Sequence, residues 1–524
     1  MKKLNKIFFI IFLATALSGC NDYLDEQPRK GNGVELKTFD QLVALLAARV
    51  DGMDRQLMWD YNVAQRYMSD CYELPTDLEF NAIFETTEDP TAFHLNCLQP
   101  QYTQELTASS TSWLINFKNI YLANTVLTYL DKVTGGTNEQ RNLLAKRAHF
   151  MRAYHYYELA NCYCVPYCEA NLNELGLPIN TDIEYKESYA RSSLKEVYDF
   201  IESELKQSLD ISTPLIENGV RKVWRENGAA VNGFAARFYL IKGDYAQAKE
   251  YAEKALAYNS DLTDYNNSSE IYMDEASDFF GIPYPAVNWY GITMENNDGL
   301  LIADYQKSYY RRNSLSGTWA IPSRKFINSF NQEYDMRYRY FYYPDYSGLS
   351  LGGMGIFFGF PQIDGYSYIC GDEFDSGPCT AEMMLIKAES MARSGQWSEA
   401  ISYLNTSFRP YRIATDAPSE IKNLSAGNKD EAIAVILKER MLEFPFTLRW
   451  HDIRRCNFND DPNDNISIIR SFYELSPGGI HSPLYDGGLK NYTLDANSNK
   501  YIYTLAIPQS EVTISNGVIE QNKY

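Results

Sequence analysis

Residues 228–257 read GAAVNGFAARFYLIKGDYAQAKEYAEKALA, and this stretch decides the fold. Apolar and small side chains recur at helical spacing on both sides of Gly243-Asp244-Tyr245. A Gly-Asp pair between two periodic segments is a turn signal, so the stretch predicts two helices joined by a tight turn. Small side chains such as Ala248 stand where those helices would meet, which allows close packing.

A second turn of the same kind occurs at Gly395-Gln396-Trp397, after a periodic segment that contains Ala388. Both units resemble the tetratricopeptide repeat, in which two helices pack across such a turn. The turn glycines, Gly243 and Gly395, are 152 positions apart, which is far more than one repeat. We therefore expect helix pairs that are separated by a long insert, rather than a tandem array.

Helical periodicity also runs through most of the chain before residue 228, at 112–132, 138–160 and 193–209. The expected fold class is mainly α: a tetratricopeptide-like helix-pair scaffold with a long, irregular, aromatic-rich insert. We expect one domain over residues 20–524, with scaffold at about 38–258, 379–456 and 500–524 and a ligand-binding insert at about 259–378.

The insert at 259–378 differs from the scaffold in composition. Its helical periodicity is poor, and it is rich in Gly, Pro, Asn and Tyr, as in Tyr340-Phe341-Tyr342-Tyr343. Irregular segments of this length inside a compact chain are usually functional. The alternative is a tyrosine-rich subdomain that only packs well, and both descriptions can hold together.

The N-terminus has the organisation of an export signal. A charged start, MKKLNK, is followed by an apolar run, IFFIIFLA, and then by Leu17-Ser18-Gly19-Cys20. The run is too short for a permanent membrane span. The ending resembles a bacterial lipobox, so we expect removal of residues 1–19 and lipidation of Cys20; the alternative is an ordinary signal peptide with an incidental cysteine. No later segment is apolar for long enough to cross a membrane, so the lipid would be the only anchor.

The formal net charge of the chain is −20, and its 42 tyrosines are the compositional outlier. A strongly acidic balance argues against nucleic acid and against electrostatic binding to anionic lipid. Tyrosine combines a rigid apolar face with a polar tip, which suits wet surfaces with many contacts. The composition therefore argues against a nucleic-acid-binding protein and favours a protein with tyrosine-rich, hydrated contact surfaces.

Apart from Cys20, the chain contains eight cysteines. An even number in an exported chain permits disulfides, but the pairing cannot be read from the sequence. Cys162, Cys164 and Cys168 have no second cysteine pair or histidine pair nearby, so buried thiols or a local disulfide are favoured over a metal site.

Several short motifs occur in a fixed order along the whole mature chain. They are CNDYLD at 20–25, AHFMRAYHYYEL at 148–159, ERMLEF at 439–444, RWHDIRR at 449–455 and AIPQSE at 506–511. In this order and spacing they resemble the SusD/RagB family of outer-membrane lipoproteins from Bacteroidetes. One departure is Tyr163-Cys164 before Val165-Pro166, where the family often has Tyr-Gly.

The resemblance implies a role for the chain. Family members lie over a SusC-like TonB-dependent transporter at the extracellular face of the outer membrane. They bind a polysaccharide or oligosaccharide, or peptides in some cases, and deliver it for import; they are not enzymes. The insert has no segment that aligns residue by residue with the family, so the identity of the ligand does not carry over.

Sugar binding requires flat apolar faces for stacking and polar groups for the hydroxyls. The insert supplies such side chains, and the loop after the first helix, where family members also bring residues to the site, supplies three more. Packing in the core is the alternative for each aromatic ring, because large aromatics serve cores more often than sites. The expected ligand residues are Trp289, Tyr290, Trp319, Asn288, Tyr309, Arg311, Asp70, Tyr72 and Glu73.

Other chemical motifs are weaker. Ser350 lies in a GxSxG pattern at 348–352, but further glycines follow instead of a helix signal, so a surface hydrolase is the least favoured alternative. The stretches at 461–465 and 495–499 resemble the start of a calcium loop without its sixth-position glycine and twelfth-position glutamate. Polar turns are favoured there, and we expect no cofactor and no catalytic residue, with a structural calcium as the weak alternative.

Overall fold

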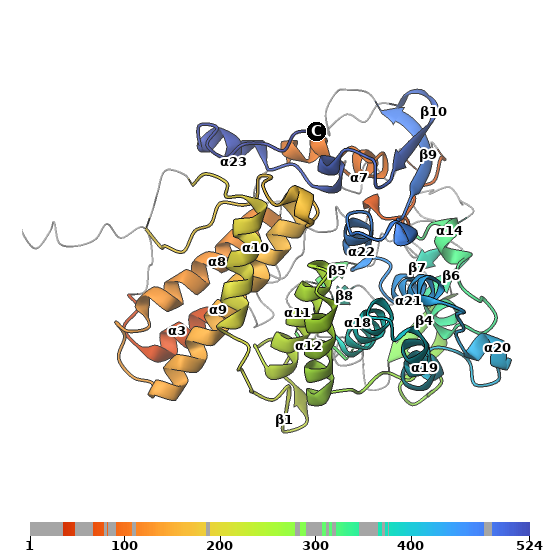
Figure 1. Ribbon diagram of the computed structural model, residues 1–524, viewed down its shortest axis with the longest axis horizontal. Coiled ribbons are helices and arrows are strands. Elements are labelled where there is room, and N and C mark those ends of the chain that lie inside the picture. Colours follow the sequence, from red (N-terminus) through yellow and green to blue (C-terminus); the bar gives the residue numbers. More distant parts are fainter. Residues whose placement is uncertain are drawn as a thin grey trace, which may run out of the picture.

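A computed structural model describes residues 35–47, 67–77, 81, 91–106, 112–184, 189–277, 283–289, 307–310, 314–316, 321–344, 365–368, 373–375, 377–475 and 485–524. Helices dominate this part of the chain, which confirms the expected mainly α fold (Figure 1). The helices are α3 (Phe39–Ala47), α7 (Thr91–Asn96), α8 (Ser112–Tyr129), α9 (Asn138–Tyr163), α10 (Leu194–Lys206), α11 (Gly228–Ile241), α12 (Tyr245–Tyr258), α14 (Arg324–Ile327), α15 (Met336–Phe341), α18 (Thr380–Arg393), α19 (Trp397–Ser407), α20 (Ser419–Lys422), α21 (Lys429–Glu443), α22 (Arg449–Cys456) and α23 (Gln509–Ile514).

The strands in the described ranges form five antiparallel pairs. Three of these pairs belong to the insert, which is where the sequence predicts an irregular region. The pairs are β1 (Ile216–Glu217) with β2 (Val220–Arg221), β3 (Ile271–Ser277) with β4 (Pro283–Trp289), β5 (Ser314–Ser316) with β8 (Glu373–Asp375), β6 (Tyr342–Tyr343) with β7 (Ser367–Tyr368), and β9 (Ile468–Leu475) with β10 (Tyr485–Leu494). The sequence did not predict the β9–β10 pair.

The helix pair α11–α12 forms as its sequence predicts. Asn227 caps α11 by accepting a hydrogen bond from the Ala230 N–H at 2.9 Å, and Asp244 caps α12 in the same way. Gly243 between them has φ +74°, a left-handed conformation that glycine adopts without strain. Gly395 has φ +92° at the matching turn between α18 and α19. Both turns therefore require glycine, because each has a positive φ at this position.

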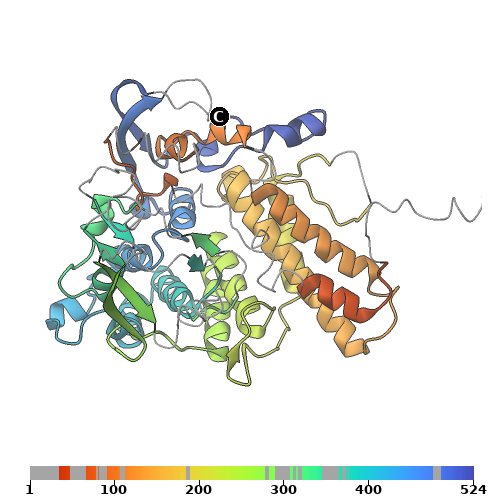
Figure 2. The ribbon, with the colours of Figure 1, turned by 180° about the vertical axis from the view of Figure 1, so that it is seen from behind.

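The two helix pairs lie side by side although the insert separates them in sequence. Helix α12 packs against α18, and the two pairs are neighbours in Figures 1 and 2. A bidentate ion pair between Arg237 on α11 and Glu382 on α18 joins them in the interior. The insert leaves and rejoins the scaffold at adjacent points, because Tyr309 contacts both Asn259 and Pro378.

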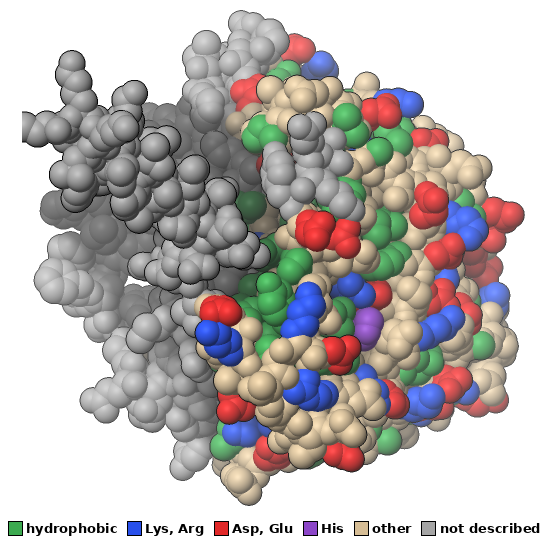
Figure 3. Space-filling view, turned by 90° about the vertical axis from the view of Figure 1, so that its left-hand side faces the viewer, with side chains coloured by type: hydrophobic (Ala, Val, Ile, Leu, Met, Phe, Trp, Pro, Cys, Tyr) green, Lys and Arg blue, Asp and Glu red, His purple; other side chains and the backbone are tan. Residues whose placement is uncertain are grey.

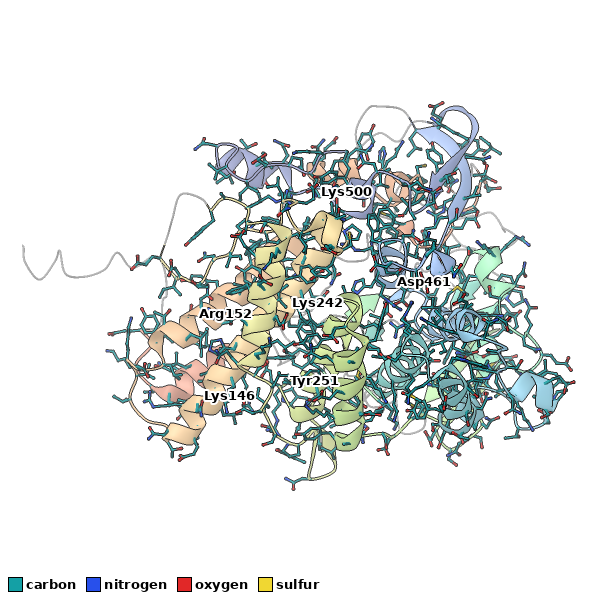
Figure 4. All side chains as sticks on the ribbon, viewed as in Figure 1. Lys146, Arg152, Lys242, Tyr251, Asp461 and Lys500 are labelled. Atoms are coloured by element: carbon teal, nitrogen blue, oxygen red, sulfur yellow. The ribbon has the colours of Figure 1, made fainter. Side chains whose placement is uncertain are left out.

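Helices α8, α9 and α10 form the other part of the scaffold. Thr137 and Ser193 begin α9 and α10 with complete capping boxes. Figure 4 labels Arg152 among the helices α8, α9 and α10. Arg152 on α9 donates to both carboxylate oxygens of Glu204 on α10 at 2.7 Å and to Asn124 on α8 at 3.2 Å. These buried contacts fix the relative positions of the three helices. The periodicity predicted each helix but not how the helices pack together.

The predicted signal peptide, residues 1–19, and Cys20 lie outside the described residues. Among the helices that are described, none combines the length and the apolar character that a membrane crossing requires.

Candidate functional site

Five of the nine predicted ligand residues belong to segments that the structure describes only in part or not at all. Tyr290, Arg311 and Trp319 lie outside the described residues. The backbones of Asn288 and Trp289 form the end of β4, where Trp289 is paired with Ile271 of β3. The predicted role of these five residues stays a prediction.

The β3–β4 pair also presents side chains that the sequence analysis did not select. Tyr272 and Met273 on β3 are 39% and 42% exposed, whereas the preceding Ile271 is buried. Tyr343 on β6, also in the insert, is 37% exposed. An exposed tyrosine on a strand offers a flat face and a hydroxyl, which is the chemistry that sugar binding requires. The sequence signal for Tyr272 is the change from an apolar residue that is buried, Ile271, to a residue that is exposed at the start of β3. A change over two residues cannot be recognised before the pairing of β3 with β4 is known.

Tyr309 is buried and ties the two ends of the insert together. Its hydroxyl donates to the Asn259 carbonyl at 2.5 Å, and its N–H donates to the Pro378 carbonyl at 2.7 Å. Asn227 at the start of α11 donates to the Tyr309 carbonyl at 2.9 Å. Burial raises the pKa of the Tyr309 hydroxyl. In this position the ring supports the insert from within and does not face a ligand.

The loop at residues 69–73, which follows the helical residues Tyr67 and Met68, lies against the insert. The Glu73 N–H donates to the Ile321 carbonyl at 3.2 Å, and the Ser323 N–H donates to the Cys71 carbonyl at 2.9 Å. The Ser323 hydroxyl also donates to the Asp70 carbonyl at 2.7 Å. We call these two paired segments, 70–73 and 321–323, the seam. It brings the predicted residues of the loop, Asp70, Tyr72 and Glu73, next to the insert.

The three predicted residues of this loop have different surroundings. Tyr72 is fully buried, with its ring edge-on to Tyr67 at 4.7 Å between centroids. Asp70 is held by Arg449, whose Nε and Nη2 each lie 2.7 Å from one of its carboxylate oxygens. Glu73 is partly exposed, as is Asp70, whose side chain is 10% exposed. Arg449 binds both carboxylate oxygens of Asp70, so Glu73 is the residue of this loop whose predicted ligand contact stays open as a prediction.

The electrostatics of the loop follow from that ion pair. Burial acts to raise the pKa of Asp70, but the charge and hydrogen bonds of Arg449 outweigh burial, so the pKa is lowered. Burial together with the adjacent Asp70 carboxylate raises the pKa of the Cys71 thiol well above its usual value. Asp70 therefore stays a carboxylate and Cys71 a thiol, and neither is activated for proton transfer or nucleophilic attack.

The remaining titratable motifs lie in polar turns or in the buried interior. Asp461 and Asp495 each accept a hydrogen bond from the backbone N–H two residues later, which makes polar turns of the two calcium-like stretches. His451 is buried, and burial together with the charges of Arg237 and Arg454 lowers its pKa to about 3. Over the described ranges, no group of three or more His, Cys, Asp or Glu side chains is arranged to hold a metal ion.

The cysteines that the structure describes carry free thiols. Cys162, Cys164 and four others are buried, and Cys168 is partly exposed. This agrees with the buried thiols that the sequence analysis favoured over a metal site. Ser350 and Cys370 lie outside the described residues.

Figure 3 shows acidic and basic side chains interspersed over the described part of one face, with hydrophobic side chains gathered between them. A mixed surface of this kind lacks the extended positive potential by which proteins attract nucleic acid. On the described part of the insert and of the loop beside it, the groups that could meet a polar ligand are the exposed Tyr272 and Tyr343 and the partly exposed Glu73.

Two family models match the sequence over separate stretches. A model described as starch-binding associating with outer membrane, SusD-like_3, matches residues 22–240. The model of the SusD family, SusD_RagB, matches residues 380–524. The insert at 259–378 lies entirely between the two matched stretches.

Relatives and solved structures agree with these matches. A SusD-like protein P2 from Formosa agariphila is 23% identical over 422 residues, which is 70% of this chain and 77% of that protein. A SusD superfamily protein from Bacteroides thetaiotaomicron has a TM-score of 0.60 at 16% identity, covering 93% of this chain and all of the other. Surface glycan-binding protein A from Bacteroides uniformis has a TM-score of 0.58 at 14% identity, covering 93% of this chain and 99% of the other. At these identities the structural likeness establishes the fold.

Proposed function

The chain belongs to the SusD/RagB family, and on this basis we propose that it captures a polysaccharide or oligosaccharide at the cell surface and passes it to a SusC-like TonB-dependent transporter. The observation that carries the proposal is the match of residues 22–240 to a family described as starch-binding at the outer membrane. The similar fold of a surface glycan-binding protein from Bacteroides uniformis supports it.

The binding surface in this proposal lies on the insert and on the seam beside it. The insert contributes Trp289, Tyr290 and Trp319 as stacking faces, with Asn288 and Arg311 for the hydroxyls. The described part adds the exposed Tyr272 and the half-exposed Glu73. Buried side chains cannot stack on a sugar ring, so Tyr72 and Tyr309 act as supports for this surface. Aromatic faces and a few polar groups are the usual composition of a shallow sugar site.

Attachment to the membrane in this proposal is through lipid on Cys20. Export and lipidation would place the protein on the extracellular face of the outer membrane, next to its transporter. A Cys20→Ala variant should move from the outer-membrane fraction to the soluble fraction and should no longer incorporate labelled palmitate. Wild-type protein that remains soluble and unlabelled would contradict the anchor without affecting the glycan-binding proposal.

Glycan binding can be tested by affinity gel electrophoresis against a panel of polysaccharides. The wild type should be retarded by at least one polysaccharide, and Trp289→Ala and Trp319→Ala should each weaken binding roughly tenfold, about 1.4 kcal/mol, the scale of one stacking contact. Trp397→Ala is the matched control, because Trp397 packs in the scaffold and should leave binding unchanged. Full affinity in both folded insert variants would move the site elsewhere.

The peptide-binding alternative has a distinct outcome in the same experiment. Absence of retardation by every polysaccharide, together with peptides that co-purify with the wild type, would overturn the glycan proposal. Hydrolysis of a polysaccharide that is lost in Ser350→Ala would instead revive the enzyme alternative.

A further inference from the structure

A buried arginine on β9 binds the backbone of the seam and of the residues next to it. Arg470 is 3% exposed and donates to four backbone carbonyls, those of Tyr67, Asn96, Ser69 and Tyr72, at 2.7 to 2.8 Å. Three of these carbonyls belong to the loop that carries Glu73. A single guanidinium therefore fixes the backbone of this loop over residues 67–72.

A second arginine holds the same loop by its side chain. Arg449 on α22 is 6% exposed and forms a bidentate pair with Asp70 at 2.7 Å for both contacts. The backbone carbonyl of Asp70 in turn accepts from the Ser323 hydroxyl of the insert. Asp70 therefore connects α22 to the insert, because its carboxylate binds Arg449 and its backbone carbonyl binds Ser323.

Only arginine has the geometry for these contacts. The guanidinium is planar and presents five N–H donors in a fixed arrangement, whereas lysine presents one compact group on a flexible stem. Four carbonyls arranged around one side chain match the planar donor set of Arg470. Lysine at this position keeps the charge but leaves some of the buried carbonyls without a donor, and an unsatisfied buried acceptor destabilises the local structure.

We infer that Arg470 and Arg449 are positioning residues for ligand binding, because they hold the seam that places Glu73 beside the insert. The inference rests on the proposed function for its binding readout, but the closure of the seam can be measured independently. The N–H groups of Glu73 and Ser323 donate across the seam and report whether it is closed.

Arg454 provides a matched control for the substitution. It is also a buried arginine that donates to backbone carbonyls, those of Tyr503 and Cys164, and it lies on the same helix as Arg449. These contacts join the C-terminal segment to the end of α9 and do not involve the seam. Arg454→Lys should therefore lower the melting temperature without opening the seam.

The experiment compares Arg470→Lys, Arg449→Lys and Arg454→Lys in the full mature protein by hydrogen exchange and by affinity for the polysaccharide that binds the wild type. In the first two variants the Glu73 and Ser323 amides should exchange near the rate of an unstructured chain. Affinity should fall about tenfold, the factor expected when only one molecule in ten keeps a binding-competent seam. In Arg454→Lys both properties should match the wild type.

The inference is overturned if the two amides stay protected in Arg470→Lys and Arg449→Lys, or if affinity falls equally in Arg454→Lys. If Arg470→Lys does not fold, Arg449→Lys decides by the same criteria. A wild type that binds no polysaccharide defeats the proposed function, and amide exchange alone then decides whether the two arginines hold the seam.

Discussion

Arg237 and Glu382 face each other with two parallel hydrogen bonds of 2.7 Å, from Nε to Oε1 and from Nη2 to Oε2. Arg237 lies on α11 and Glu382 near the start of α18, where the insert rejoins the scaffold. Both side chains are buried, at 3% and 0% exposure. The ion pair therefore joins the two helix pairs through the interior and requires both charges to be present.

Removal of one member of this pair should be strongly destabilising. Glu382→Gln or Arg237→Met leaves the other group buried without its partner, which costs about 3–5 kcal/mol. The free energy of unfolding from urea titration measures this loss. Lys195→Gln, in the exposed pair with Asp199, is the control and should leave the free energy of unfolding unchanged, because solvent screens an exposed pair. A loss below about 1 kcal/mol in both interior variants would contradict the predicted role.

His451 should make the protein less stable as the pH falls from 7 to 5. Its pKa is about 3 in the folded chain, so the folded protein keeps it neutral while the unfolded chain binds a proton below about pH 6.5. The state that binds more protons gains on acidification, which here is the unfolded state. The contribution of this group between pH 7 and pH 5 is about 2 kcal/mol.

The measurement for His451 is the urea-derived free energy of unfolding at pH 7, 6 and 5. A folded His451→Gln variant should lose about 2 kcal/mol less than the wild type over this interval, since glutamine does not titrate. If the free energy of unfolding depends on pH equally in the wild type and in His451→Gln, the prediction is wrong, because the histidine then has the same pKa in the folded and unfolded chain.

Tyr309→Phe should loosen the insert at its base. The substitution removes the hydrogen bond to the Asn259 carbonyl and leaves that acceptor without its donor, at a cost of about 1–3 kcal/mol. Limited proteolysis should cut within 259–378 faster in the variant, while cleavage in the scaffold stays unchanged. Tyr121→Phe removes an exposed hydroxyl from α8 and is the control. Equal cleavage rates in the two variants would show that the Tyr309–Asn259 hydrogen bond does not hold the base of the insert.

Glu73 and Asp70 should respond differently to substitution although they are three positions apart. Glu73→Gln should keep the melting temperature and weaken glycan affinity by about three- to tenfold, because a charged hydrogen bond to a hydroxyl is lost. Asp70→Asn should lower the melting temperature, because it leaves Arg449 buried without its charge partner. Calorimetric titration and thermal unfolding of both variants separate the two effects. Unchanged affinity in Glu73→Gln would remove this residue from the binding surface.

The helices of the scaffold were predictable because their signals are local. Asn227, Asp244 and Ser193 act as caps at the helix starts, and Gly243 takes the left-handed conformation that its turn requires. Periodicity over one or two turns of helix sets which side chains face inward, and this information is contained in neighbouring residues. The mainly α class and the division of the scaffold by an insert followed directly.

The roles of the candidate site residues could not be read in the same way. Asp70 has the composition of a ligand residue, but its partner Arg449 lies 379 positions away. Tyr309 stands in a tyrosine-rich stretch that suggests a surface, yet its hydroxyl is bound to a carbonyl 50 positions earlier. The four carbonyls around Arg470 belong to two segments that are more than 370 positions from it. No local pattern contains such pairings.

By itself, the sequence determined the helices, their caps, the glycine turns and the family, since each depends on side chains within a few positions or on motifs in a fixed order. Tertiary structure decided which polar and aromatic side chains face solvent. A carboxylate or a tyrosine is stable either in water or in the interior with its partners satisfied, and the choice between the two depends on residues that only folding brings within hydrogen-bonding distance. For this reason Glu73 remains at the surface while Asp70, three residues before it, is held in the interior by an arginine from the far end of the chain.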